Sequence, residues 1–373
     1  NIITFYLEIQ MPNSLNKLYI GTMSGTSYDG IDVCAISVRK KIDLIHFSSF
    51  KYPPKLRKKI AAVIKDQILS LKDYGELNIQ IGLAFAKAIN TFIKQNNFST
   101  SQIVALGLSG QTLWHNPQSK YPFSIQAGDA AIVSKECGID VVHDFRNDHI
   151  SLGGEGAPLV PEFHQKLFSI SNQDRLILNI GGISNYSYLT KSKDFFGSDS
   201  GPGNALLDSY SQKFLDQDYD RNGLLARKGT VHKASLNKML AHPFFKKRQP
   251  KSTGKEIFNI RFIPKSLLQQ SSENILATLT ELTAITIAQA IKHKQQSINE
   301  IIVCGGGIKN LFLIERIGHY VSLPIVSSEL IGYDPQSIEA MAFGWLASQR
   351  VTNKPLIVGK SKGLVGKITK FKS

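Results

Sequence analysis

The chain has 373 residues, more than one ordinary hydrophobic core holds, so two domains are expected. Its 42% hydrophobic and 20% charged residues are typical of a soluble globular protein, and no stretch approaches the roughly 18 uninterrupted apolar residues of a membrane span. The net charge is +15, but the basic residues are dispersed and are not interleaved with stacking aromatics, which argues against nucleic acid as a partner.

The first ten residues, NIITFYLEIQ, lack the basic region and the small-residue cleavage site of a secretory signal. Met11 is a candidate natural start, which would make residues 1–10 an extension. Three cysteines, Cys34, Cys137 and Cys304, lie far apart, without C-x-x-C pairing or metal-ligand spacing, and the histidines form no H-x-x-x-H cluster. These features predict reduced thiols, no zinc site and a cytoplasmic location.

The segment IGTMSGTSYDGID at 20–32 is the first glycine-rich stretch of the chain. It joins an apolar run at 18–23 to a β-branched run at 31–38, and a third such run follows at 42–50. Extended runs separated by Gly, Ser and Asp are typical of strands joined by turns. The sequence therefore predicts a strand, a turn and a strand, followed by a third strand.

Gly25 and Gly30 have the glycine spacing of a P-loop, but Ile31-Asp32 stands where that motif has Lys and Ser or Thr. A P-loop is also followed by a helix, whereas a strand is expected here. We infer a different phosphate cradle, in which the backbone binds phosphate and Asp29 and Asp32 hold a hydrated Mg²⁺. Each carboxylate has a simpler alternative, since Asp29 is an ordinary turn residue before glycine and Asp32 is harmless if it faces solvent.

Helical and extended patterns alternate along the rest of the chain, which predicts an α/β fold. Helices are predicted at 55–70, 76–96, 129–138, 204–215, 273–294, 310–318 and 339–348. Further strands are predicted at 104–108, 141–143, 176–180 and 301–304.

Four glycine clusters follow predicted strands, at 21–30, 107–110, 181–182 and 305–307. In open α/β sheets ligands bind beyond the carboxyl ends of the strands, and glycine lets the backbone approach a ligand closely, so these clusters favour a nucleotide site.

Other motifs of this kind fit poorly. The cluster at 305–307 lacks the third glycine of G-x-G-x-x-G, and Gly107-Leu-Ser-Gly110 misses the G-x-S-x-G elbow by one residue. Asp199-Ser200-Gly201 is similar to a serine-protease motif, but alternating helices and strands argue against that fold. Phosphoryl transfer remains, because it needs mainly positioning, charge neutralisation and a base.

Several longer motifs occur in one order over nearly the whole chain. They are GTMSGTSYDGID at 21–32, GQTLWH at 110–115, DFR at 144–146, GGEGAPLVP at 153–161, NIGGISN at 179–185, DSGPGNALLD at 199–208, KSTGK at 251–255, TLTELT at 278–283 and GGGIKN at 305–310. This set resembles the actin/Hsp70/sugar-kinase superfamily and, within it, the anhydro-N-acetylmuramic acid kinase family.

The resemblance implies two RNase H-like (actin-like ATPase) domains with the active site in the cleft between them. The N-terminal domain would comprise residues 1–145 and 352–373, and the C-terminal domain residues 146–351. It also implies a homodimer and a cleft that closes, because excluding water protects phosphoryl transfer from ATP hydrolysis.

The resemblance further implies an activity. The family opens the 1,6-anhydro bond of 1,6-anhydro-N-acetylmuramic acid with water and phosphorylates O6 from ATP, which gives N-acetylmuramic acid 6-phosphate and ADP in peptidoglycan recycling. Asp199 matches the aspartate that activates the water, a role that needs an ionised carboxylate within hydrogen-bond reach. From the residues alone, Asp199 is equally an N-cap or loop residue before the helix predicted at 204–215.

The remaining roles are carried over position by position. ATP phosphates and Mg²⁺ would be contacted by Gly25, Thr26, Ser27, Tyr28, Asp29, Gly30, Ile31 and Asp32, with Asp29 and Asp32 holding the metal through waters. A second phosphate loop would be Gly181 and Gly182, and the adenosine would lie near Gly305, Gly306 and Asn310. The sugar would be contacted by Gln111, Arg146 and Glu339.

Two of these assignments have structural alternatives. Arg146 suits the lactyl carboxylate of the sugar, because a guanidinium binds carboxylate bidentately, but it could instead form an ion pair with Asp144 or Asp148. Glu339 could be only a favourable acid in the first turn of a helix.

Three positions depart from the family pattern. Ser109 replaces the usual His, Tyr28 the usual Leu and Glu155 the usual Gln. Ser109 cannot carry a positive charge, and Glu155 adds a negative charge near an anionic substrate. These departures leave two alternatives open: a nucleotide-binding sensor without turnover, and a kinase of a different sugar.

Overall fold

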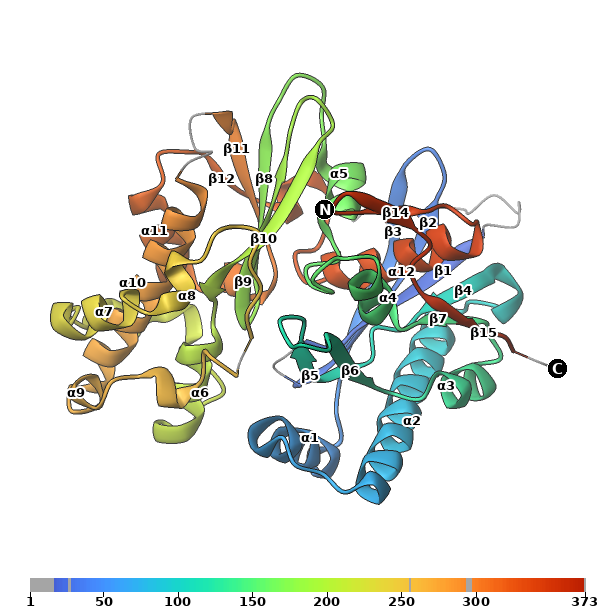
Figure 1. Ribbon diagram of the computed structural model, residues 1–373, viewed down its shortest axis with the longest axis horizontal. Helices are drawn as coiled ribbons and strands as arrows, with labels where there is room; N and C mark the ends of the chain where they lie inside the picture. The colour runs from blue at the N-terminus through green and yellow to red at the C-terminus, as the bar shows by residue number, and fades with distance from the viewer. Residues whose placement is uncertain (1–16, 26–27, 255, 293–296, 372–373) are drawn as a thin grey trace, which may run out of the picture.

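Two mixed β-sheets form the framework of the protein in the computed structural model, one in each half of the molecule (Figure 1). The structure describes residues 17–25, 28–254, 256–292 and 297–371. Both sheets combine parallel and antiparallel strands with helices on their faces, so the predicted α/β fold is confirmed.

The first sheet holds the three strands predicted around the Gly-rich turn. Its order is β15 (Lys367–Thr369), β7 (Val141–His143), β4 (Ile103–Gly107), β1 (Leu18–Met23), β2 (Gly30–Val38) and β3 (Ile42–Lys51). Strands β1, β4 and β7 run parallel, whereas β2 is antiparallel to both β1 and β3.

The second sheet repeats this arrangement. Its order is β10 (Phe195–Pro202), β9 (Ile183–Leu189), β8 (Arg175–Ile180), β11 (Glu300–Cys304) and β12 (Ile325–Ser327). Again three neighbouring strands are parallel and the second strand in sequence is antiparallel. Both sheets thus have the strand order 3-2-1-4-5 of an RNase H-like domain, with β15 added at one edge.

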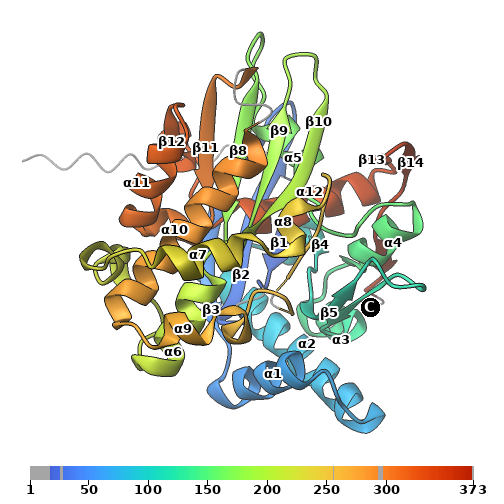
Figure 2. The same cartoon turned by 60° about the vertical axis from the view of Figure 1, so that its left-hand side comes forward.

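Helices fill three layers around the two sheets (Figures 1 and 2). Residues of α1 (Pro54–Asp66), α2 (Leu71–Gln95) and α3 (Ala130–Cys137) share a core with one face of the first sheet. Residues of α10 (Ser272–Ile291) and α11 (Leu311–Tyr320) share a core with the outer face of the second sheet.

The middle layer contains α5 (Pro161–Phe168) and α12 (Ile338–Val351). Their buried side chains belong to one hydrophobic cluster with residues of both sheets, among them Tyr19 of β1 and Ile302 of β11. Helix α12 packs on β1, β2 and β4 of the first sheet. We therefore propose that the chain returns to the N-terminal domain near residue 338, ahead of the boundary at 352 expected from the sequence.

The remaining elements are short. They are β5 (Gln111–Asn116), β6 (Phe123–Ala127), α4 (Phe145–Ser151), α6 (Ala205–Phe214), α7 (Lys233–Leu240), α8 (Pro243–Lys246), α9 (Lys265–Leu268), β13 (Leu356–Val358) and β14 (Ser361–Gly363).

The predicted boundary between the first two helices is wrong on both sides, because the helix expected at 76–96 begins at Leu71. The helix expected at 55–70 ends at Asp66, because Gln67 adopts a left-handed backbone conformation with φ of 54°. Ser70 then begins α2 by accepting a hydrogen bond from the Asp73 N–H. An N-cap serine is a strong start signal, and it separates the two helices.

Helix α10 is the one helix in the described part of the chain that is long and apolar enough to span a membrane. Its most apolar window is 72% buried inside the protein, as expected for the core helix of a domain. The three cysteines are buried and free, in agreement with the sequence prediction.

Candidate active site

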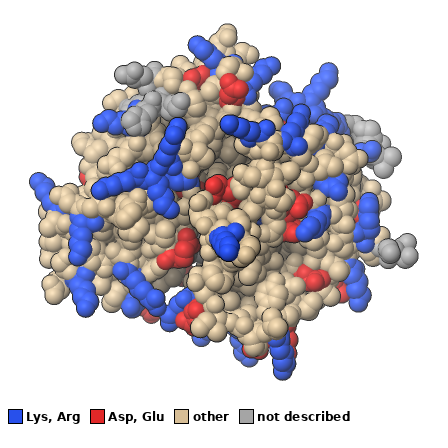
Figure 3. All heavy atoms as spheres, in the orientation of Figure 1, with Lys and Arg blue, Asp and Glu red and all other residues tan. Residues whose placement is uncertain are grey.

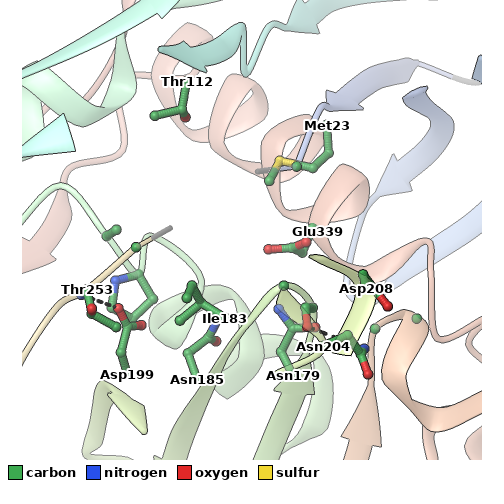
Figure 4. Close-up of a pocket in the computed structure, with 18 of the residues that line it drawn as sticks. Met23, Thr112, Asn179, Ile183, Asn185, Asp199, Asn204, Asp208, Thr253 and Glu339 are labelled. Carbon is green, nitrogen blue, oxygen red and sulfur yellow. Dashed lines mark hydrogen bonds between the residues drawn. The ribbon is translucent and has the colours of Figure 1, made fainter. Parts of the chain in front are cut away.

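A cavity of about 1140 Å³ is lined by residues from both halves of the molecule. The space-filling view shows a hollow near the centre of one face, with acidic side chains at its border and basic ones spread around it (Figure 3). In the close-up, Met23 and Glu339 approach the cavity from one side and Asp199, Asn185 and Asn179 from the other (Figure 4). All five residues line this cavity.

The turn between β1 and β2 contributes Gly25, Asp29, Gly30 and Asp32 to the lining. Burial raises the pKa of Asp32 to about 7; a hydrogen bond with Ser49 opposes the rise, and the carboxylates of Asp29, Glu339 and Asp334 add to it. Asp32 lines the cavity from a partly buried position, and negative charge accumulates at this end of the cavity.

The other residues expected in this turn differ in position. Ile31 is 2% exposed and belongs to the first core, so its side chain does not line the cavity. Tyr28 has φ of 45°, and its ring packs against the same core. Thr26 and Ser27 lie outside the described residues.

Asp199 lies near the end of β10 and is only 5% exposed. Its Oδ2 accepts a hydrogen bond from the Thr253 N–H at 2.8 Å, and its own N–H donates to the Lys251 carbonyl at 2.9 Å. Burial raises the pKa of Asp199 to about 7, against the opposing hydrogen bond from Thr253. The alternative of a helix cap is wrong, because Asn204 occupies the N-cap position of α6.

Arg146 and Glu339 enter the cavity from α4 and from the first turn of α12. Burial lowers the pKa of Arg146, and the charges of Glu339 and Asp199 oppose this. Burial likewise raises the pKa of Glu339, and Arg146 opposes it. The guanidinium thus lies in the field of two carboxylates from different elements.

The alternative, an ion pair of Arg146 with Asp144 or Asp148, does not occur among the described residues. Asp144 instead pairs with Lys367 at 2.5 Å, and Asp148 accepts a hydrogen bond from the Gly366 N–H. Arg146 donates to the Gly156 carbonyl at 2.9 Å, while its Nε is buried without a partner.

The later glycine clusters also reach the cavity. Gly181, Gly182, Gly305 and Gly306 all line it, together with Asn310. Gly305 has φ of 82°, and a Cβ there would lie 2.3 Å from Asn179 Oδ1, so only glycine fits this strand end. Asn310 caps α11, its Oδ1 accepting from the Leu313 N–H at 3.1 Å, which leaves its amide N–H₂ group for other contacts.

Gln111 is not among the lining residues, although a sugar contact was expected. It is fully buried, where its Oε1 accepts from Ser24 Oγ at 2.7 Å and its Nε2 donates to the Gly25 carbonyl at 3.3 Å. The side chain therefore supports the Gly-rich turn from behind.

All three departures from the family pattern lie outside the cavity lining, Tyr28 as described above. Ser109 is 6% exposed and accepts a hydrogen bond from the Ser24 N–H at 3.2 Å. Glu155 accepts one from Gln118 Nε2 at 2.6 Å. Ser109 thus supports the same turn as Gln111.

Several lining residues had no role assigned from the sequence. Buried polar atoms without a partner occur at His115 Nε2, Asn185 Oδ1 and Thr253 Oγ1, in addition to Arg146 Nε. Buried polar groups are normally hydrogen-bonded, so these atoms fit a polar ligand with several hydroxyl or carbonyl groups. All three residues lie inside the motifs that carry the family resemblance. Membership in these motifs was the one sequence signal that could have found them.

The acidic end of the cavity is the place where a metal ion could bind. No three His, Cys, Asp or Glu side chains in the described ranges are grouped closely enough to hold an ion alone. Mg²⁺ commonly uses one or two carboxylates together with waters and phosphate oxygens. Burial, and after it the neighbouring carboxylates, raise the pKa of Asp32, and a cation beside it would favour the ionised form. The residues present therefore fit Mg²⁺ bound together with a nucleotide.

Solved structures similar to this chain are distant in sequence. Component A of (R)-2-hydroxyglutaryl-CoA dehydratase from Acidaminococcus fermentans aligns with a TM-score of 0.46 and 11% identity, covering 90% of this chain and 99% of the other. A ROK family glucokinase from Streptomyces griseus, in complex with glucose and AMPPNP, aligns with a TM-score of 0.39 and 11% identity, covering 89% and 99%.

Sequence relatives are much closer. The family description "Anhydro-N-acetylmuramic acid kinase" matches residues 17–368. Proteins of that name are 47% identical in gamma-proteobacterium EBAC31A08, over 95% of this chain and 99% of the relative, and 40% identical in Pasteurella multocida, over 90% and 91%. The chain belongs to the anhydro-N-acetylmuramic acid kinase family.

Proposed function

We propose that this protein is a sugar kinase that hydrolyses the 1,6-anhydro bond of 1,6-anhydro-N-acetylmuramic acid and phosphorylates O6 from ATP. The products are N-acetylmuramic acid 6-phosphate and ADP, which places the enzyme in peptidoglycan recycling and amino sugar catabolism. The observation that carries the proposal is the position of Asp199, a deeply buried carboxylate that faces the same cavity as three glycine clusters.

The glycine clusters suit the binding of ATP. Backbone around Gly25, Gly30 and Gly181–Gly182 would hold the phosphates, and Gly305, Gly306 and Asn310 would lie beside the adenosine. Asp29 and Asp32 would hold Mg²⁺ through waters, where the ion neutralises charge on the transferred phosphoryl group.

Asp199 would act as the general base in ring opening. Its carboxylate takes a proton from water as the water oxygen bonds to C1 of the sugar and the C1–O6 bond breaks. The released O6 bonds to the γ-phosphorus of ATP, and the bond from that phosphorus to the bridging oxygen of ADP breaks. The hydrogen bond from the Thr253 N–H fixes the direction of the carboxylate during the proton transfer.

The sugar would be oriented by Arg146, Glu339 and the unpartnered polar atoms of the cavity. The guanidinium suits the lactyl carboxylate, since charge-assisted hydrogen bonds of this kind are strong and directional. For Gln111 we propose support of the phosphate turn in place of the direct sugar contact expected from the sequence, because its amide groups bind Ser24 and Gly25.

Family membership and composition support a cytoplasmic enzyme with small-molecule substrates. A homodimer is proposed on the resemblance alone. The dispersed basic residues give no reason to propose nucleic acid or a membrane as a partner.

The activity assay separates the proposed function from its alternatives. Purified protein with Mg-ATP should form ADP only when 1,6-anhydro-N-acetylmuramic acid is added, and the sugar product should carry a phosphate on O6. Absent or sugar-independent turnover would favour the nucleotide-binding sensor. Higher kcat/KM with plain N-acetylmuramic acid or glucose would favour a kinase of a different sugar.

We also expect the reaction to need a basic form of the enzyme with a pKa near 7. Asp199 titrates at about 7 because burial disfavours its charge and Glu256 adds to this, whereas Thr253 and Arg146 oppose it. A protonated carboxyl cannot accept a proton, so kcat/KM for the sugar should fall about tenfold per pH unit below this pKa and level off above it.

The profile should be measured at saturating Mg-ATP, because a metal contact would keep Asp32 ionised. A kcat/KM that is flat from pH 5 to 8, or that rises toward low pH, would contradict the assignment of the base.

A further inference from the structure

A second cavity of about 380 Å³ lies beside β10, next to the proposed active site. Ser200 lines this cavity, whereas its neighbour Asp199 lines the first, as expected where successive side chains of a strand point to opposite faces. The other walls come from the end of α8, the loop that follows it and the C-terminal part of α10. Its volume lies at the lower end of the roughly 300–1,000 Å³ typical of small-molecule sites.

The charged residues that line this cavity are all basic. Lys246, Lys247, Arg248 and Lys251 line it, and no Asp or Glu does so among the described residues. None of these four cations forms an ion pair within the described part of the chain. A concave surface with unbalanced positive charge concentrates anions.

Lys251 gives the cavity a buried cation as well as exposed ones. The residue is 9% exposed, and its ammonium donates to the carbonyls of Phe244 at 3.1 Å and Phe245 at 3.3 Å. An ammonium has three N–H donors, so these two bonds leave one donor for a further acceptor. The hydrogen-bond partners of this buried ammonium are neutral carbonyls, and the charge of Asp199 favours its protonated form. An anion in the cavity would add further negative charge beside a cation that is costly to bury.

We propose that this second cavity binds a phosphate group, either as inorganic phosphate or as the phosphomonoester of a sugar. Lysine and arginine together supply both point charges and the planar fork that matches phosphate oxygens. The cavity has room for more than the phosphate alone, so a sugar phosphate fits as well.

The same short segment lines this cavity and holds the proposed base. The Lys251 carbonyl accepts from the Asp199 N–H, the Lys251 N–H donates to Ser198 Oγ at 3.1 Å, and the Thr253 N–H donates to Asp199 Oδ2. An anion that contacts Lys251 therefore acts on a segment whose backbone fixes the carboxylate. Lys247 lines both cavities, so it is a second link between them besides the segment that contains Lys251.

Binding is tested directly by isothermal titration calorimetry with inorganic phosphate and, separately, with N-acetylmuramic acid 6-phosphate, at constant ionic strength. The test variant is Lys246→Gln/Arg248→Gln, because these two exposed side chains line the second cavity and not the first. The matched control is Lys360→Gln/Lys362→Gln, which removes two exposed positive charges near the β13–β14 hairpin.

We expect saturable binding of at least one of the two anions to the native protein and to the control, with at least tenfold weaker affinity in the test variant. Binding of inorganic phosphate alone identifies a free phosphate site, and binding of the sugar phosphate alone identifies a phosphomonoester site. Absence of saturable binding by both anions, or equal affinity in the native protein and the test variant, overturns the proposal. Heat of binding is measured without turnover, so the result does not depend on the proposed kinase activity.

Discussion

Replacing Asp199 by Asn should lower kcat by about 10²–10⁴-fold, the range that a positioned general base contributes. Asparagine keeps the shape of the side chain, and its Oδ1 can still accept the hydrogen bond from the Thr253 N–H. It cannot take a proton from water, so ring opening loses its base. ADP formation that depends on the sugar measures this effect, and the titration near pH 7 should vanish from the residual activity.

The variant should bind ATP normally and remain folded. Because burial raises the pKa of Asp199 above its unfolded value, this group stabilises the folded state at low pH, and that contribution is lost as the pH rises through about 7. At pH 8 the native protein therefore carries an unfavourable buried charge that the variant lacks. The variant should melt at the same or a higher temperature there, and retained turnover would refute the role of Asp199.

The glycines that line the cavity could be predicted from the sequence, because a close approach of backbone requires glycine at a fixed position of the chain. Gly305 illustrates the reason, because its left-handed conformation and its closeness to Asn179 exclude any side chain at this strand end. Asp199 could not be assigned from the residues alone. Its burial and its contact with Thr253 arise from segments more than fifty positions apart.

Gln111 shows what spacing cannot predict. The family resemblance implied a sugar contact for Gln111, but the spacing of its motif does not show where the side chain points. The isolated bridge between Ser24 and Gln111 brings it behind the phosphate turn, and this pairing joins residues 87 positions apart. Tertiary pairing decides which way the side chain of Gln111 points, and the local sequence pattern does not indicate it.

Strands β5 and β10 were not predicted from the sequence, for a related physical reason. Strands β5 and β10 border the cavity and therefore carry polar residues and glycine where a core strand would carry apolar ones. Without alternating hydrophobic residues, the period of two that identifies a half-buried strand is absent. The strands of the cores, such as β1 and β11, are apolar and were predicted within one residue of their observed bounds.

Replacing Gly21 by Ala should cost about 3 kcal/mol of folding free energy, the upper range for overpacking a core. Gly21 lies in β1 directly against α12, and a Cβ there would lie 1.9 Å from the Ala340 carbonyl oxygen and 2.5 Å from the Gly344 N. Both contacts are backbone atoms of a buried helix, so neither can rotate away. The helix must move, and Glu339 moves with it out of its place in the cavity.

The matched control is Gly75→Ala in α2, where an added Cβ would meet no atom within 4 Å. Alanine is the better helix former, so this change should stabilise the protein by about 0.5–1 kcal/mol. Urea unfolding should therefore show a lower midpoint for Gly21→Ala and a higher one for Gly75→Ala. Only Gly21→Ala should also lower kcat/KM for the sugar. An unchanged midpoint in Gly21→Ala would mean that α12 does not pack backbone to backbone on β1, and the position of Glu339 would then need another explanation.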